Sequence, residues 1–147
     1  TVIIHLIFFT MRFFKIFVAF ILLQIIAQGN LKAQDFVELY QKMVQETQAK
    51  NYPQAATYGE QAEPLAEKAL GKGSEKLGSF YYNLGNIQSS AGNAIKAETA
   101  YKKCIEIRKT LVGVQHPDYI KTIDKLAQLY AATGKQAESD KLLAQLK

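Results

Sequence analysis

The sequence predicts an all-α protein, an α-solenoid of about three stacked helix-turn-helix repeats after an N-terminal signal peptide. Three observations predict it. After residue 34, apolar residues recur at three- and four-residue steps, as they do on one face of an amphipathic helix. The stretches 83–98 and 125–140 align without a gap at an offset of 42 positions. Residues 1–27, by contrast, are strongly apolar and carry only two charges.

The segment over residues 11–33 has the three parts of an export signal. Arg12 and Lys15 supply a short positive region, residues 16–27 supply an apolar region of twelve residues, and small and polar residues follow as far as Ala33. A helix of twelve residues rises only about 18 Å, against about 30 Å for the hydrocarbon of a bilayer. We therefore expect a signal peptide that is cleaved after Ala33.

Residues 1–10 precede this signal and lack an initiator methionine, so we expect them to be an over-extended start of the reading frame. If they belong to the protein, residues 1–27 are long enough for an uncleaved membrane anchor, and this alternative stays open. If the signal peptide is cleaved, we expect the repeats to be exported to the periplasm or the extracellular space. Contact with a membrane is expected only through an uncleaved signal.

Charge and side-chain chemistry exclude several classes of function. The chain has 18 Lys and Arg against 13 Asp and Glu, and loss of Arg12, Lys15 and Lys32 with the signal leaves 15 against 13. So small and interspersed a charge excludes an electrostatic surface for nucleic acid. The single cysteine, Cys104, cannot form an internal disulfide, and one histidine, His116, follows the signal. These are too few for a zinc site, and we expect no metal and no cofactor.

The repeat domain, residues 34–147, divides into units of about 35–73, 74–115 and 116–147. Each unit is expected to form two helices, because two apolar stripes separated by a turn recur in it. The stripes of the second unit are Leu77, Phe80, Tyr81, Leu84, Ile87 and Ala91, then Ala97, Ala100, Tyr101, Cys104, Ile105, Arg108 and Leu111. Gly92 suits the end of the first of these helices, and Pro117 suits the first turn of the next unit.

The first unit fits this register less well than the other two. The residue 42 positions before Leu84 is Lys42, whereas the nearby apolar residues are Tyr40, Met43 and Val44. We therefore expect its leading helix to slip by one residue, and we assign no binding positions to it.

These residues resemble a known repeat. Leu84-Gly85, then Gly92, then Ala97 match the pattern of the tetratricopeptide repeat, and the resemblance covers residues 35–147. The period of 42 positions and the "HPD" that opens the third unit are similar to the kinesin-light-chain-type subclass. The resemblance implies a non-enzymatic module that binds proteins or peptides on a concave face lined by the first helix of each unit.

Mapped by the family pattern, nine residues are expected to face that groove. They are Ser79, Tyr82, Asn83, Asn86 and Ser89 in the second unit, and Lys121, Asp124, Lys125 and Gln128 in the third. Amides can hold the backbone of a partner, and lysines can bind a carboxylate. The alternative is that these residues form only the solvated face of amphipathic helices.

Cys104, His116 and Asp118 could be mistaken for a nucleophile with its base and acid. The spacing argues against it, because the helix that carries Cys104 would place the cysteine roughly 10 Å from His116, and a working pair needs about 3 Å. We expect Cys104 to be a buried core residue, and His116 and Asp118 to belong to the start of the next helix. No catalytic residue is predicted.

Two further functions stay open. Arrays of this kind with bacterial-type signals resemble the N-terminal regions of larger proteins, including those with a caspase-like CHAT peptidase domain, which implies a scaffold for an enzyme. The final helix also lacks a polar cap over its apolar face, which favours end-to-end self-association into a structural assembly.

Overall fold

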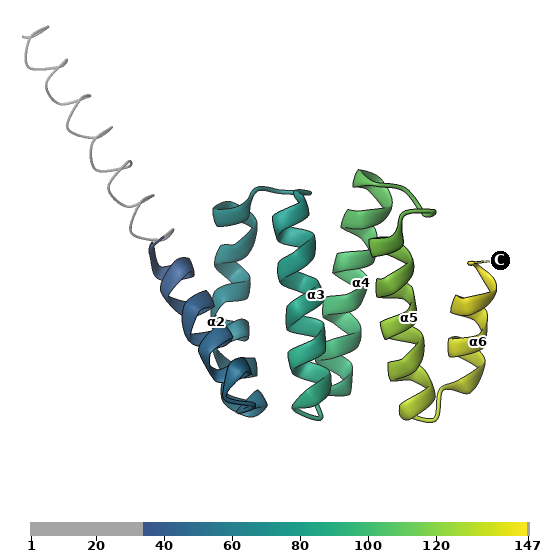
Figure 1. Cartoon of the computed structure of the whole chain (residues 1–147), viewed down its shortest axis with the longest axis horizontal. Helices are drawn as coiled ribbons and strands as arrows, with labels where there is room; N and C mark the ends of the chain where they lie inside the picture. Colours follow the sequence, from purple (N-terminus) through teal and green to yellow (C-terminus); the bar gives the residue numbers. More distant parts are fainter. Residues whose placement is uncertain (1–33, 147) are drawn as a thin grey trace, which may run out of the picture.

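The computed structural model describes residues 34–146, so the predictions made for residues 1–33 lie outside the described part. Within it the chain is helical, with short turns and no strand, and the predicted all-α solenoid is confirmed (Figure 1). The helices are a first helix over residues 34–48, α2 (Tyr52–Leu70), α3 (Glu75–Ser90), α4 (Ala94–Leu111), α5 (Pro117–Ala132) and α6 (Gln136–Ala144).

Successive helices stand side by side in a row and alternate in direction (Figure 1). The turns after α2 and α4 lie along one edge of the row, at the top of the view, and the turns after the first helix, α3 and α5 lie along the opposite edge. Contacts run from α2 to α3, from α3 to α4, from α4 to α5 and from α5 to α6. Each pair therefore depends on its neighbours for burial, as in other solenoids.

The turns within the three units recur at a strict offset of 42 positions. Lys50, Gly92 and Gly134 all adopt a left-handed backbone, with φ of 58°, 80° and 79°. At each turn the next amide donates to the carbonyl five residues earlier, over 2.8–2.9 Å. The expected one-residue slip of the first helix is therefore wrong, because this helix ends in the same register as α3 and α5.

The surroundings of Lys42 explain why a polar residue stands at this position without any slip. Lys42 occupies the position of the buried Leu84, but its side chain is 44% exposed and its Nζ lies 2.7 Å from Glu38 Oε1. Leu84 lies against Gly59 of the preceding helix, whereas among the described residues no helix precedes the first one. A solvated ion pair therefore stands where a core residue stands in the second unit.

The buried residues form two clusters. The first joins the first helix, α2 and α3, with Ala100 and Cys104 of α4, and the second joins α4 to α5 and α6. The largest fully buried side chains are Tyr101, Phe80, Met43, Ile123, Leu126, Gln88, Thr122 and Cys104. At about 25 cal/mol per Å² of apolar surface, these clusters are the main source of stability in the array.

Large and small residues exchange places between the first two units. In the first unit Met43 packs against Gly59, and a Cβ on Gly59 would lie 3.2 Å from the Met43 sulfur. In the second unit the glycine is on the other helix, and a Cβ on Gly85 would lie 2.6 Å from the ring of Tyr101. The two helix pairs therefore reach similar packing with opposite choices of residue.

Side-chain caps begin the leading helices of the second and third units. Ser74 Oγ accepts a hydrogen bond from the Leu77 amide at 3.1 Å, and His116 Nδ1 accepts one from the Asp118 amide at 3.2 Å. Both bonds satisfy amides that a helix leaves without an internal partner. The prediction that His116 and Asp118 belong to a helix start is confirmed.

Glu98 ties the second unit to the third. Its carboxylate accepts hydrogen bonds from Lys102 Nζ at 2.7 Å, Tyr130 Oη at 2.9 Å and Lys135 Nζ at 3.0 Å. These hydrogen bonds lower the pKa of Glu98 to about 2. The bond from Lys102 is the largest cause, and those from Lys135 and Tyr130 add to it. A carboxylate with three donors is held in its charged form.

Glu60 has the corresponding role between the first unit and the second. Its Oε1 accepts from Lys96 Nζ at 2.6 Å and from the buried Gln88 Nε2 at 2.9 Å. These bonds lower the pKa of Glu60, with Lys96 as the largest cause. Gln88 and Tyr130 are 42 positions apart, so one repeat position makes both links.

In the described part of the chain, no helix is both long enough and apolar enough to cross a membrane.

Candidate partner-binding face

The first helix, α3 and α5 are the leading helices of the three units, and they carry all the predicted groove positions. Two spaces lie between them. We call the space between the first helix and α3 the first valley, and the space between α3 and α5 the second valley. The predicted residues lie on α3 and α5, so only those on α3 can contribute to the first valley.

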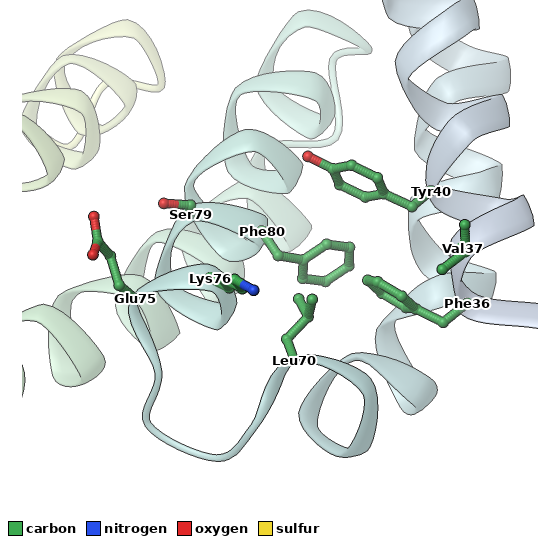
Figure 2. Close-up of a pocket in the computed structure, with 8 residues that line it drawn as sticks. All are labelled: Phe36, Val37, Tyr40, Leu70, Glu75, Lys76, Ser79 and Phe80. Carbon is green, nitrogen blue, oxygen red and sulfur yellow. The ribbon is translucent and has the colours of Figure 1, made fainter. Parts of the chain in front are cut away.

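The first valley contains two hollows. The larger, of about 570 Å³, is lined by Phe36, Val37, Tyr40, Leu70, Glu75, Lys76, Ser79 and Phe80. Figure 2 shows the side chains of Phe36, Tyr40 and Phe80 gathered together beside Leu70, while Glu75 points away from them. The ring centroids of Phe36 and Phe80 are 5.7 Å apart in an edge-on arrangement, and those of Phe36 and Tyr40 are 5.8 Å apart and stacked. The floor of this hollow is therefore aromatic.

The second hollow lies further along the same two helices. It has a volume of about 300 Å³ and is lined by Met43, Val44, Thr47, Gln48, Asn83, Asn86 and Ile87. Its floor is apolar and its rim carries amides. Because the lining residues on each helix advance by about seven positions between the hollows, the two are aligned along the helix axes about 10 Å apart.

The two predicted asparagines differ in what they can offer. Asn83 is exposed, and within residues 34–146 its side chain makes no hydrogen bond. Asn86 Oδ1 already accepts a hydrogen bond from Tyr101 Oη at 2.8 Å. Burial raises the pKa of Tyr101, which keeps its hydroxyl protonated as the donor. Asn83 is therefore free to bind through both ends of its amide, whereas Asn86 has its two N–H donors and only one remaining lone pair on Oδ1.

Tyr82 lies in the second valley and is packed on several sides. Its ring centroid is 5.0 Å from Arg108 Cζ and 5.2 Å from Lys121 Nζ. The ring of Tyr101 is 6.4 Å away. The structure thus brings two predicted residues, Tyr82 and Lys121, together across α3 and α5, with cation–π contacts between them.

The other predicted residues of α5 remain on its surface. Gln128 Nε2 donates to Asp124 Oδ2 at 2.6 Å along the exposed side of the helix. Lys125 is half-buried. On α3, Ser79 lines the larger hollow, and Ser89 is exposed near the helix end.

Sequence reasoning missed the contribution of the first helix. Val37, Tyr40 and Val44 line the hollows, yet no binding position was assigned there because a slip was expected. The strict offset of 42 positions would have found them, since it carries Ser79 onto Val37 and Asn86 onto Val44.

Cys104 is a core residue, as predicted. It is fully buried, its Sγ lies 3.6 Å from Thr122 Oγ1, and burial raises the pKa of its thiol. A buried thiol with a raised pKa is a poor nucleophile. Among the described residues, no group of three or more His, Cys, Asp or Glu could hold a metal ion.

Comparison with known proteins agrees with this architecture. The family model of the tetratricopeptide repeat matches residues 44–110 and, in a second and overlapping copy, residues 79–146. Each match spans more than one helix pair, and together they cover more than half of the chain. The comparison with curated proteins gave no match. From its helical hairpins, their common register and this match, the chain belongs to the tetratricopeptide repeat family.

Proposed function

We propose that this protein is an exported tetratricopeptide module that binds a protein or peptide on the face formed by the first helix, α3 and α5, and that it performs no catalysis of its own. Tetratricopeptide repeats generally mediate protein–protein interaction. The observation that carries the proposal for this chain is the first valley, where two hollows are aligned between the first helix and α3.

The first valley has the chemistry that peptide recognition needs. Its aromatic and aliphatic floor can bury apolar side chains of a partner, and the exposed half of Val37 adds to this surface. Asn83 at the rim has a donor and an acceptor for a peptide backbone. Two hollows about 10 Å apart would accept side chains three residues apart in an extended segment, since a strand rises about 3.3 Å per residue.

Two features support binding over catalysis and over nucleic-acid recognition. The single cysteine is buried against Thr122, and the histidine beyond the signal caps α5. The repeat domain carries nearly balanced charges, with its exposed lysines interspersed among acids. The partner we propose is therefore a protein or a peptide.

Export rests on the sequence of residues 11–33, with its positive region, apolar region and small residues before the repeats. We propose cleavage after Ala33 and a location in the periplasm or the extracellular space, with an uncleaved membrane anchor as the alternative. Determining the N-terminal residue of the protein recovered from the membranes and from the soluble fractions of its own cells tests this. A start at Gln34 supports cleavage, and a start at or before Met11 supports the anchor.

The binding proposal is tested by affinity capture from the native envelope with two matched variants. Val37→Asp places a charge in the larger hollow, at a side chain that is 51% exposed. Ile95→Asp is the control, because Ile95 is 82% exposed and lies on α4, outside the first valley. We expect a partner that the unchanged protein and Ile95→Asp retain and Val37→Asp loses. Equal recovery with all three proteins would contradict the site.

One observation favours self-association as a second candidate. Leu143 on α6 is 39% exposed at the position that Tyr101, 42 positions earlier, occupies against the next unit. A second copy could cover this apolar side chain. Sedimentation of the protein across a range of concentrations tests it, and a constant monomer mass would contradict it.

The finer family placement also remains a proposal. The period of 42 positions supports the kinesin-light-chain-like subclass, and the export signal supports a scaffold within a larger protein of the CHAT peptidase type. Reading the gene beyond Lys147 tests the second point. An in-frame peptidase domain would support it, and a stop codon at that place would contradict it.

A further inference from the structure

Exposed aliphatic side chains gather at one edge of the array, which we call the apolar edge. It carries the turns after α2 and α4, and the first helix begins there, because the turn that ends this helix lies along the opposite edge (Figure 1). At the turn after α4, Leu111 is 47% exposed, Val112 38% and Val114 44%. From Thr110 to Gln115 no residue is charged. Such a cluster of exposed apolar side chains is typical of a contact surface.

The repeat architecture does not require an apolar side chain at this tip. At an offset of 42 positions, Val114 corresponds to Lys72 in the turn after α2. Gly113 and Gly71, which precede them, both have a left-handed backbone, with φ of 84° and 89°. The same kind of turn therefore forms with a lysine as well as with a valine, and the exposure of Val114 has no role in the turn itself.

The apolar surface continues from this edge into a hollow between α2 and α4. The hollow has a volume of about 660 Å³, and its lining includes Leu77, Ile107 and Leu111. Lys72 also lines it, with a side chain that is 89% exposed and lies 3.8 Å from Glu67 Oε1. So long and solvated an ion pair holds the lysine only weakly. The apolar edge thus combines aliphatic side chains with a cation that is free to move to another anion.

The start of the first helix relates this edge to a membrane. The apolar region of the N-terminal segment ends at residue 27, and the first helix begins at residue 34. The stretch between them reaches at most about 25 Å when fully extended. While a bilayer contains the apolar region, the apolar edge is therefore the part of the repeats that is tethered closest to the lipid. This position favours a lipid surface over a protein partner as the occupant of the edge.

We propose that, while residues 1–33 remain attached, the apolar edge docks on the lipid bilayer. Leu111, Val112 and Val114 enter the interface between headgroups and acyl chains, where their aliphatic side chains leave water and the backbone of the turn stays hydrated. Lys72 lies at the level of the headgroups and is attracted by anionic lipid. The helices then stand upright on the membrane, and the first valley, which runs along them, remains open to a partner at the side.

The test uses single tryptophan reporters, because the chain has no tryptophan of its own. Val114→Trp places a reporter on the apolar edge. Ile95→Trp is the matched reporter, because Ile95 is 82% exposed at the start of α4, near the opposite edge. The full chain is reconstituted in vesicles of phosphatidylcholine and phosphatidylglycerol, with and without brominated acyl chains, which quench a tryptophan that enters the bilayer.

We expect the emission of Val114→Trp to shift to the blue in vesicles. Brominated lipid should quench it about threefold more strongly than it quenches Ile95→Trp, because only the apolar edge enters the interface. Equal quenching of the two reporters, or an aqueous emission from both, would overturn the proposal.

Three further substitutions in the Val114→Trp protein make the result specific. Val112→Asp should abolish the blue shift, because a carboxylate at the tip stays in water, and circular dichroism checks that the helices are retained. Ile95→Asp should leave the shift unchanged. Lys72→Gln should lower the quenching in the mixed vesicles but not in vesicles of phosphatidylcholine alone. A blue shift that survives Val112→Asp, or equal losses with Val112→Asp and Ile95→Asp, would contradict insertion of the tip.

A protein as the occupant of this edge gives a different result. The Val114→Trp reporter would then keep its aqueous emission in vesicles and shift only when the captured partner is added, and this outcome would overturn the lipid proposal. The inference is independent of the proposed binding face, because Val37→Asp tests the first valley and leaves the turn after α4 unchanged.

Discussion

In the second unit, the buried side chain of Tyr101 of α4 reaches α3, where its hydroxyl donates to Asn86 and its ring lies near Tyr82. In the first unit the residue 42 positions earlier is Gly59, so α2 sends no side chain to this place. The first valley contains two hollows. In the second valley, by contrast, Arg108, Lys121 and the ring of Tyr101 all lie against the ring of Tyr82.

The leading helices also change in character along the array. At one repeat position stand Val37, Ser79 and Lys121, and at another stand Val44, Asn86 and Gln128. The face thus passes from apolar residues in the first unit to polar or charged residues in the second and third, while the turns beneath it keep the same backbone geometry. A regular backbone can therefore present different chemistry at each unit, because the turns and the core maintain the register and leave the face free to vary.

The largest expected effect comes from Gly85→Ala, which forces a methyl group to within 2.6 Å of the Tyr101 ring. We expect a loss of about 3 kcal/mol in the free energy of unfolding, because a ring held by Asn86 cannot move aside. Gly59→Ala in the first unit should cost less, since the nearest atom is the flexible Leu84 Cδ1 at 2.5 Å. Urea denaturation followed by circular dichroism measures both. Equal losses would mean that the two helix pairs do not differ in rigidity.

Gly78→Ala is the control for this pair, because it lies on the same helix as Gly85 and its nearest contact is Ile107 Cγ2 at 3.3 Å. The helix propensity of alanine exceeds that of glycine by about 1 kcal/mol, which should offset the mild contact. We expect a change near zero in the free energy of unfolding. A loss as large as that of Gly85→Ala would show that any methyl group on α3 is disruptive.

Thr122→Val should have the next largest effect, because it removes the hydroxyl that accepts from Arg108 Nη1 at 2.7 Å. We expect a loss of about 2 kcal/mol in the free energy of unfolding, typical of a buried hydrogen bond to a charged group. Thr110→Val is the control. Thr110 bonds to the carbonyl four residues earlier, as Thr122 does, but is exposed on α4. Similar losses for the two variants would mean that the contact with Arg108 adds nothing to stability.

Glu98→Gln removes the ionised link between the second and third units. At pH 7 we expect a loss of about 1 kcal/mol, less than the pKa difference alone implies, because the lysines around Glu98 are exposed and solvent screens them. The folded-state pKa of about 2 lies below the ordinary 4.5, so the stabilisation is complete above pH 4.5 and disappears as the pH falls through 2.

The free energy of unfolding of the unchanged protein should therefore fall between about pH 5 and pH 2, and Glu98→Gln should flatten part of this decline. Glu60→Gln, at the joint between the first two units, should flatten it less, because Glu60 has two donors where Glu98 has three. Thermal unfolding across this pH range measures the difference. An identical pH profile for Glu98→Gln and the unchanged protein would contradict the assignment.

The sequence was sufficient to predict the repeat, the helix ends at Gly92 and Pro117, and the burial of Cys104, because these depend on local pattern and on spacing. Arg108 stood within a predicted apolar stripe, so its burial followed, but its lack of an acidic partner did not. Asn86 could not be distinguished from Asn83, because the bond to Tyr101 depends on how α4 packs against α3. The hollows of the first valley likewise depend on packing between helices. In the first unit the large side chain of a facing pair is Met43 of the first helix, opposite Gly59, whereas in the second unit it is Tyr101 of α4, opposite Gly85.

Val37→Asp should have the smallest effect on stability, and this is what makes it useful in the binding experiment. Val37 is 51% exposed at the open side of the larger hollow, so a carboxylate there can remain hydrated. We expect the free energy of unfolding to change by no more than about 0.5 kcal/mol, as for other surface substitutions. Urea denaturation measures it, with Ile95→Asp beside it. A loss above about 1 kcal/mol would mean that Val37 belongs to the core and that the larger hollow of the first valley is not open to a partner.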